Sequence, residues 1–273
     1  MPTSAPTAPT PSGATAVPGR WFYVWMSGAC LAVAVLGFAP TYFLPLAQGA
    51  FDAPPIIHIH GIVLFSWMAF FCLQSWRVAT GDIRGHRAWG VLGVAIATAM
   101  VFVVTAVVSL RIQQANLAGQ PAGLAHDVRA FGWVSFGVLL FFTPAFGLAI
   151  ANIPRPEVHK RLMLLATTSM LGAPIARWFA VLLAPPADPH APPWPAGLPD
   201  VTPAPISVAL QPHLVGDLLL VAALLYDWRT RRRPHWVYVA GGAILLLIQV
   251  TTEPVSQSAA WQAIATAIGR LNG

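Results

Sequence analysis

The stretch PPIIHIHGIVLFSWMAFFCLQSW, from Pro54 to Trp76, decides the fold. Apart from the two histidines near its start, His58 and His60, it is almost wholly apolar. A helix that crosses a bilayer needs about 20 mostly apolar residues, and this run is long enough. Titratable side chains inside a membrane are costly and normally face the protein interior or a wet cavity. The stretch therefore predicts a membrane helix with a polar site at one end.

The composition of the whole chain agrees with a membrane protein. Hydrophobic residues make up 56% of the 273, charged residues only 9%, and the mean hydropathy is +0.66. A soluble domain carries about 25% charged residues, so this chain lies well outside that class. We expect an all-α bundle that forms one unit within the lipid bilayer.

Apolar runs predict seven spans over residues 21–254, with six as the alternative because polar residues interrupt the sixth run and the seventh is short. The predicted spans are Trp21–Phe43, Ile57–Ala79, Ala88–Leu110, Ala130–Asn152, Val158–Leu183, Ile206–Trp228 and Trp236–Thr252. Residues 1–20, rich in Pro, Thr and Ala, predict a disordered tail. Residues 185–205 include nine prolines and predict an extended loop that caps the outer face.

The charges between the spans predict the orientation. Eleven basic residues fall on one side, three on the other, and Arg177 lies inside the fifth span. Because cytoplasmic loops carry the excess of Lys and Arg, the N-terminus and the tail 1–20 are predicted in the cytoplasm and the C-terminus outside, in a bacterial inner membrane. The basic residues lie in short loops and form no stripe, which excludes nucleic acid as a partner.

The C-terminal residues 255–273 predict an amphipathic helix. Trp261, Ile264, Ile268 and Leu271 follow one another at spacings of three and four. Such a helix either lies on the outer membrane surface or packs against the bundle, and the sequence leaves both open.

Three polar side chains are predicted at a similar depth near the outer ends of separate spans: His60, His213 and Arg177. Asp217 follows His213 by four residues, so the two share a helix face. A carboxylate in that position often supports a metal-ligating histidine, and His60 with His213 is the preferred ligand pair. The alternative is a structural polar knot that fixes the helix packing.

Two further histidines begin helices on the cytoplasmic side. His86 lies in DIRGHRAWG and His159 in RPEVHKRLM, each beside arginines. Anchoring at the membrane interface explains the arginines without any chemistry, and we favour that interpretation. The histidines are otherwise candidate cofactor ligands or phosphate contacts at helix N-termini.

These motifs carry a resemblance. His60-Gly61, Gln74, HRAWG and PEVHKRLM together resemble a broad group of uncharacterised bacterial multi-pass predicted membrane proteins, over roughly Phe22 to Trp178. A looser likeness is to haem-binding membrane proteins of the cytochrome b561 kind and to small oxidase-assembly proteins. The resemblance implies a shared role for His60, Gln74, His86, Arg87, His159, Arg161 and Arg177. The chain departs from the group at Leu162, Leu165 and Ala166, where an aromatic residue and a second arginine followed by serine are expected.

Three functions follow from these patterns. The first is electron transfer through haem b or a transition metal ion held by histidines, with contact to a quinone as a variant. The second is a proton-coupled transporter, in which Pro174 or Pro212 breaks a helix near the ionisable residues. The third is a non-catalytic factor that assembles a respiratory complex through membrane protein partners. The chain has no GxSxG, HExxH or P-loop motif, so nothing in it resembles a hydrolase. Whether it is an enzyme of another kind is left open.

Overall fold

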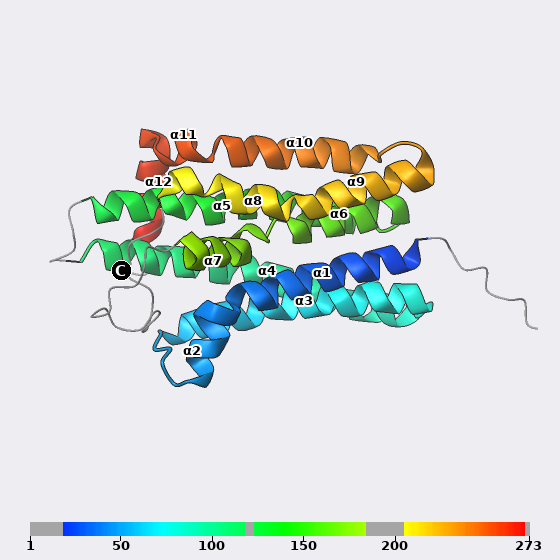
Figure 1. Ribbon diagram of the computed structural model, residues 1–273, viewed down its shortest axis with the longest axis horizontal. Helices are drawn as coiled ribbons and strands as arrows, with labels where there is room; N and C mark the ends of the chain where they lie inside the picture. Colours follow the sequence, from blue (N-terminus) through cyan, green and yellow to red (C-terminus); the bar gives the residue numbers. More distant parts are fainter. Residues whose placement is uncertain (1–18, 118–122, 184–204, 271–273) are drawn as a thin grey trace, which may run out of the picture.

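The computed structural model describes residues 19–117, 123–183 and 205–270, and every element in these ranges is a helix (Figure 1). The predicted tail 1–20 and loop 185–205 lie outside the described residues, except for residues 19, 20 and 205. The longer helices are α1 (Arg20–Phe38), α3 (Pro55–Thr80), α4 (Ile83–Ala115), α5 (Leu124–Ala151), α6 (Pro156–Thr168), α7 (Gly172–Leu183), α9 (Leu218–Arg231), α10 (Trp236–Val250) and α12 (Ala259–Gly269). The shorter ones are a π-helix (Ala39–Phe43), α2 (Leu44–Ala47), a 3-10 turn (Ile206–Val208), α8 (Leu210–Gly216) and α11 (Thr252–Ser256).

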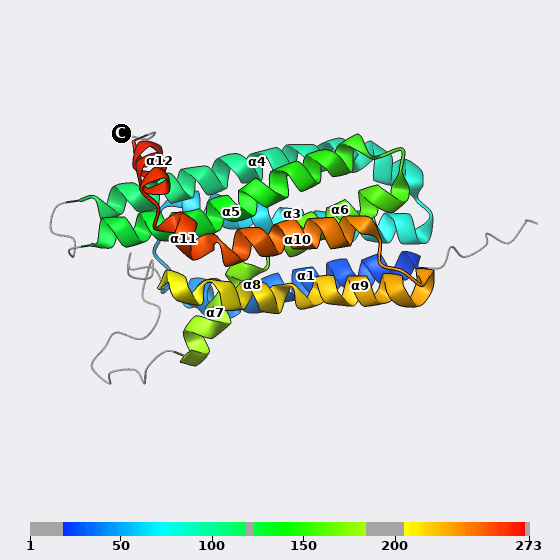
Figure 2. The same ribbon diagram turned by 90° about the horizontal axis from the view of Figure 1, so that it is seen from above.

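The chain is a multi-pass helical bundle. In the described part of the chain, six helical runs are long and apolar enough to cross a membrane. They are Arg20–Ala47, Pro55–Thr80, Ile83–Ala115, Leu124–Ala151, Pro156–Leu182 and Ile206–Arg231. The predicted seventh span forms α10, which is apolar but shorter, and which runs along the bundle beside α9 (Figures 1 and 2).

The long helices extend beyond the apolar runs that predicted them. Helix α4 begins at Ile83, whereas hydropathy places the start of this span at Ala88. The reason is a cap: the carboxylate of Asp82 accepts the backbone N–H of Gly85 at 2.9 Å. Hydropathy marks the part of a helix that suits lipid, while the cap fixes where the helix itself begins.

The predicted first span is not one continuous α-helix. After Phe38 the chain forms the π-helix, which contains Pro40. Proline has no N–H, so Pro40 cannot donate to the carbonyl of Leu36 one turn earlier. The carbonyl of Leu36 accepts the backbone N–H of Ala39 and, at 3.0 Å, also the indole Nε1–H of Trp178 on α7. This bond ties the distorted end of the first span to the fifth.

The predicted fifth span is broken in its middle. Helix α6 ends at Thr168, α7 begins at Gly172, and α7 turns away from the axis of α6 (Figure 2). Pro174 causes the break, because it cannot donate to the carbonyl of Met170 and so cannot continue α6. The predicted fifth span is found as the run Pro156–Leu182, and the prediction that Pro174 breaks a helix there is confirmed.

Two apolar clusters hold the described helices together. The larger joins the middle of the bundle, around the fully buried side chains of Trp67, Phe142 and Leu164. The smaller joins α12 to α4 and α5. In it Trp261 is 4% exposed, and its indole N–H donates to the carbonyl of Arg129 at 2.7 Å. Helix α12 therefore packs against the bundle, which is one of the two arrangements that the sequence left open.

Most of the basic residues share one end of the bundle, which we call the basic end. The start of α1 and the α3–α4, α5–α6 and α9–α10 connections all lie at this end, on the right in Figure 1. Helices α2, α7, α11 and α12 lie toward the opposite end. The positively charged loops therefore meet on one face, as expected of a membrane protein with a charge bias.

Candidate functional site

The break between α6 and α7 lies inside the protein and is lined by hydroxyl groups. Thr167, Thr168 and Ser169 are each at most 2% exposed. Their hydroxyls donate to carbonyls three or four residues earlier, on Met163, Leu165 and Ala166 respectively. In a membrane interior, backbone polar groups must be satisfied within the protein, and these side chains satisfy carbonyls at the end of α6. The interruption is thus a stable part of the fold.

His213, on α8, packs directly against the start of α7. A Cβ atom placed on Gly172 would lie 2.5 Å from Nε2 and from Cδ2 of His213, so only glycine fits there. The Nδ1 of His213 lies 2.7 Å from the carbonyl oxygen of Ala209. Because a carbonyl only accepts, Nδ1 carries a proton and donates to Ala209, and the Nε2 edge of the ring faces Gly172.

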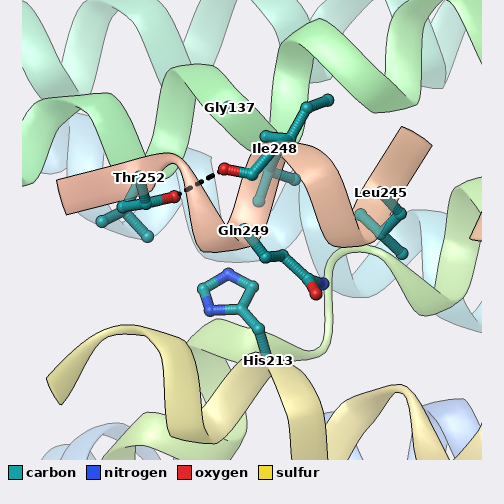
Figure 3. A pocket seen from close by; sticks show the side chains of 8 residues that line it. Gly137, His213, Leu245, Ile248, Gln249 and Thr252 are labelled. Atoms are coloured by element: carbon teal, nitrogen blue, oxygen red, sulfur yellow. Dashed lines mark hydrogen bonds between the residues drawn. The ribbon is translucent and has the colours of Figure 1, made fainter. Parts of the chain in front are cut away.

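Asp217 and Gln249 extend this polar group toward α10. The amide Nε2 of Gln249 donates to a carboxylate oxygen of Asp217 at 3.4 Å, while Oε1 of Gln249 is buried with no partner among the described residues. Figure 3 shows the His213 ring next to the Gln249 side chain, at a small cavity also lined by Gly137 and Thr252. The cavity has a volume of about 10 Å³, which is room for one water molecule.

Arg177, one turn and a half into α7, lies among other positive groups. Its guanidinium is close enough to His60 and to Arg111 for their charges to interact, and it lies 5.3 Å from the ring centroid of Phe38. The ion pairs found among the described residues include neither Arg177 nor Arg111. Nδ1 of His60 is buried and has no partner in the described part of the chain.

The structure brings together some of the predicted outer residues but not others. His213 lies with Asp217, and His60 with Arg177, as two neighbouring groups linked through α7. No contact pairs His60 with His213 in residues 19–117, 123–183 and 205–270, and these ranges hold no group of three or more His, Cys, Asp or Glu that could bind a metal. Cofactor sites need roughly 300–1,000 Å³, so a haem does not fit the cavity of about 10 Å³ beside His213.

The predicted inner histidines do lie together. The rings of His86 and His159 are 6.3 Å apart between centroids. Nδ1 of His159 lies 2.8 Å from the carbonyl oxygen of Ala149, which leaves its Nε2 as a free acceptor. The amide of Gln74 donates to the carbonyl of His86 at 3.1 Å, while Oε1 of Gln74 and Nδ1 of His86 are buried without partners among the described residues. Two unsatisfied polar atoms at one place mark a second candidate site.

The sequence analysis missed the carboxylate that binds Arg161. Arg161 is 2% exposed and Asp227 is 0% exposed, and the guanidinium Nε donates to Asp227 at 2.8 Å. Glu157 accepts a second bond from Arg161 at 2.6 Å and one from Arg231 at 2.7 Å. The network joins α6, α9 and the start of α10 at the basic end. The signal available in the sequence was Asp227 itself, a carboxylate in the last turn of the sixth predicted span.

His235 belongs to the edge of this network and caps α10. The ring Nδ1 of His235 accepts the backbone N–H of Val237 at 3.2 Å. The backbone N–H of His235 donates to the carboxylate of Asp227 at 3.2 Å. Burial lowers the pKa of His235, and the charges of Arg161 and Arg231 lower it further. The neutral ring is the form that can accept the Val237 N–H, so the cap and the lowered pKa agree.

Two more residues of the outer site were also missed. Gln249 lies in the short seventh apolar run, and Arg111 was counted only as a loop charge. Arg111 in fact lies in the last two turns of α4, because that helix runs on to Ala115. Extending the predicted helix past its apolar run would have placed Arg111 on α4 rather than in a loop.

Comparison of the chain with protein-family models, with curated proteins and with solved structures found no match. The resemblance drawn from the sequence motifs therefore stays a prediction. What the chain does has to be argued from the positions of its own residues.

Proposed function

We propose that this chain is a membrane carrier that binds a small anion near Arg177 and couples its passage to protonation at His213 and Asp217. The observation that carries the proposal is the place of Arg177. It lies on the short helix after a break in a membrane-crossing run, within electrostatic range of Arg111 and His60, and the ion pairs among the described residues do not include it.

The broken fifth span supports a carrier more than an electron-transfer protein. Transporters place substrate sites where membrane helices are interrupted, because irregular backbone in a bilayer is tolerated only inside protein or beside a cavity. The break at residues 169–171 is such a place, and the last turn of α1, directly before the π-helix, is bonded to α7 through Trp178. π-Helical turns in membrane helices are frequent at functional sites.

The charges at the site favour an anion as the bound species. Ionisable residues inside a membrane are expensive and are normally paired with an opposite charge. The charges of Arg177 and Arg111 lie within interaction range of each other, and the ion pairs of the described residues involve neither of them. Guanidinium groups bind carboxylate or phosphate oxygens in a bidentate manner, so a small oxyanion would supply the missing charge.

His213 and Asp217 supply the means to move a proton. The hydrogen bonds of the described residues use Nδ1 of His213 and leave its Nε2 unbonded, and Asp217 accepts a hydrogen bond from the amide of Gln249. A water in the small cavity would lie beside His213 and Gln249. Titratable groups next to a broken helix are the usual parts of a proton relay in carriers. We infer that protonation at this pair balances the charge of the anion.

The proposal includes the topology. We place the basic end of the bundle in the cytoplasm of a bacterial inner membrane, following the bias of positive charge. Helix α10, of 15 residues, is continued by α11 and counts as a seventh crossing in this arrangement, which puts α12 outside. The anion site on α7 then lies nearer the outer face than the cytoplasmic face.

Transport in vesicles tests the proposal. The purified chain is placed in proteoliposomes, and uptake of a panel of small carboxylates, phosphate and sulfate is measured with and without a pH gradient. Uptake of at least one anion, lost in Arg177→Gln and kept in Arg270→Gln, supports the carrier. Arg270 is an exposed arginine after α12 and serves as the matched control. Uptake that is absent for every anion, or equal in Arg177→Gln, contradicts it.

A second candidate function rests on His86 and His159. One ion bound about 2 Å from a nitrogen of each ring would hold the ring centroids roughly 5–6 Å apart, close to the observed 6.3 Å. Oε1 of Gln74 would be available as a third ligand. Metal analysis of the purified chain tests this: about one Cu or Fe per chain, lost in His159→Ala, supports a metal-dependent redox role. No stoichiometric metal contradicts it.

A further inference from the structure

A cavity of about 280 Å³ lies at the basic end, between the end of α9 and the start of α10. Its wall is made by Arg231, Arg233, Pro234, His235 and Trp236. Nothing in the carrier or in the inner histidine pair uses these residues. The cavity is outside the six runs that are long enough to cross a membrane, apart from Arg231 at the end of the last one.

The backbone at this turn directs two arginines to one place. Arg232 has φ 60°, in the left-handed region, and is the one non-glycine residue with a positive φ among those described. Such a conformation costs about 1 kcal/mol or more for a residue with a Cβ. Here it reverses the chain directly after α9, so that the side chains before and after it, Arg231 and Arg233, line the same cavity.

The cavity is positively charged. Arg231 shares its charge with Glu157 at 2.7 Å, but Arg233 is exposed and no acid lines the cavity. The nearest buried carboxylate, Asp227, already accepts from Arg161 and from the N–H of His235. Helix α10 begins at the cavity, and the start of a helix adds partial positive charge.

We propose that this cavity binds a phosphate group. Two guanidinium groups and a helix start are the arrangement that binds phosphate oxygens in proteins. The volume is enough for a phosphate with a small headgroup but is below that of sites that enclose whole drug-sized ligands. Trp236, which is 64% exposed, stands beside it, and exposed tryptophans at helix ends lie at the headgroup level of a bilayer.

The phosphate could belong to the headgroup of an anionic lipid or to free phosphate. Native mass spectrometry of the full chain in detergent separates the two. Phosphatidylglycerol and phosphatidylcholine are titrated in turn, and inorganic phosphate is added as competitor. The variants are Arg233→Gln, which removes a cavity charge, and Arg229→Gln, which removes a nearby exposed charge that does not line the cavity.

We expect phosphatidylglycerol to bind more tightly than phosphatidylcholine, and Arg233→Gln to weaken its binding about fivefold while Arg229→Gln does not. Binding that millimolar phosphate does not displace identifies a lipid site. Displacement by phosphate with the same pattern of variants identifies a free-phosphate site, which also supports the proposal. Equal effects of the two variants, or equal binding of the two lipids, would overturn it. Because Arg233 is exposed, unchanged thermal unfolding of the variant shows that the fold is intact.

Discussion

The Nε2 edge of His213 occupies the space in which a side chain on Gly172 would lie, at 2.5 Å from the ideal Cβ position. This contact fixes the proposed proton acceptor against the first residue of α7. It also makes the α6–α7 break sensitive to a single methyl group. Since a well-packed interior gives way only at a cost, the contact can be tested by adding that methyl group.

Gly172→Ala is expected to destabilise the protein by about 1–3 kcal/mol, because the ring of His213 or the start of α7 must move. Thermal unfolding in detergent measures the effect. Gly147→Ala, within α5, is the control, since a Cβ there meets nothing within 4 Å. That variant should be neutral or slightly stabilised, because alanine favours helix. Equal stability of the two variants would show that His213 does not pack on Gly172.

Asp227→Asn is expected to destabilise the chain by about 3–5 kcal/mol, because it leaves the charge of Arg161 buried without its main partner. Chemical unfolding followed by circular dichroism gives the difference. Lys160→Gln removes a partly exposed ion pair with Glu157 and should cost about 1 kcal/mol or less. A loss of under 1 kcal/mol in Asp227→Asn would mean that the pair is not buried as described.

Trp178→Phe is expected to cost about 1 kcal/mol, because it removes the indole N–H that donates to the carbonyl of Leu36. The same exchange at Trp25, which is exposed on α1, should leave the unfolding temperature unchanged. Thermal unfolding of the two variants side by side makes the comparison. If they match, the backbone N–H of Ala39 is enough to satisfy the carbonyl of Leu36 without the indole.

Acidification is expected to weaken the start of α10. The pKa of His235 is lowered in the folded chain, so the unfolded chain binds the proton first as the pH falls. The stability that this residue contributes is complete above its ordinary pKa of about 6.5 and is lost as the pH falls below it toward the lowered pKa of the folded chain. The charged groups that act on it are Arg161, Arg231, Asp227 and Glu157.

Unfolding of wild type and of His235→Asn between pH 5 and pH 8 measures this. Asparagine also caps helices but does not titrate, so the variant should lose less stability toward pH 5 than wild type does. Parallel pH profiles for the two proteins would rule out a role for His235 in the pH dependence.

The sequence alone predicted the class of fold and part of the site, for physical reasons. Long apolar runs such as Ile57–Ala79 have one stable form in a bilayer, and the structure has a helix there. His213 and Asp217 were placed together because a spacing of four residues fixes a helix face. Contacts between residues on different helices are not marked by any fixed spacing in the sequence. The pairing of Arg161 with Asp227, and the place of Arg111 beside Arg177, depend on packing that a single sequence does not encode in a readable way.

The break in the fifth span could be predicted only in part from the sequence. Pro174 marks it in the sequence, since a proline inside a helix removes a donor. Its consequence, a change of direction that places Arg177 near His60, depends on the glycine that lets His213 approach. The expectation that His60 and His213 share a ligand rested on their similar depth near the outer ends of separate spans. With α7 turned away, they face different neighbours.

Proton movement driven by an anion gradient tests the central claim most directly. Proteoliposomes that contain the chain and a pH-sensitive dye receive an outside pulse of the anion identified by uptake, and the internal pH is recorded. The account predicts acidification for wild type, no signal for Arg177→Gln, and anion uptake without acidification for His213→Gln. Acidification that persists unchanged in His213→Gln and in Asp217→Asn would contradict it.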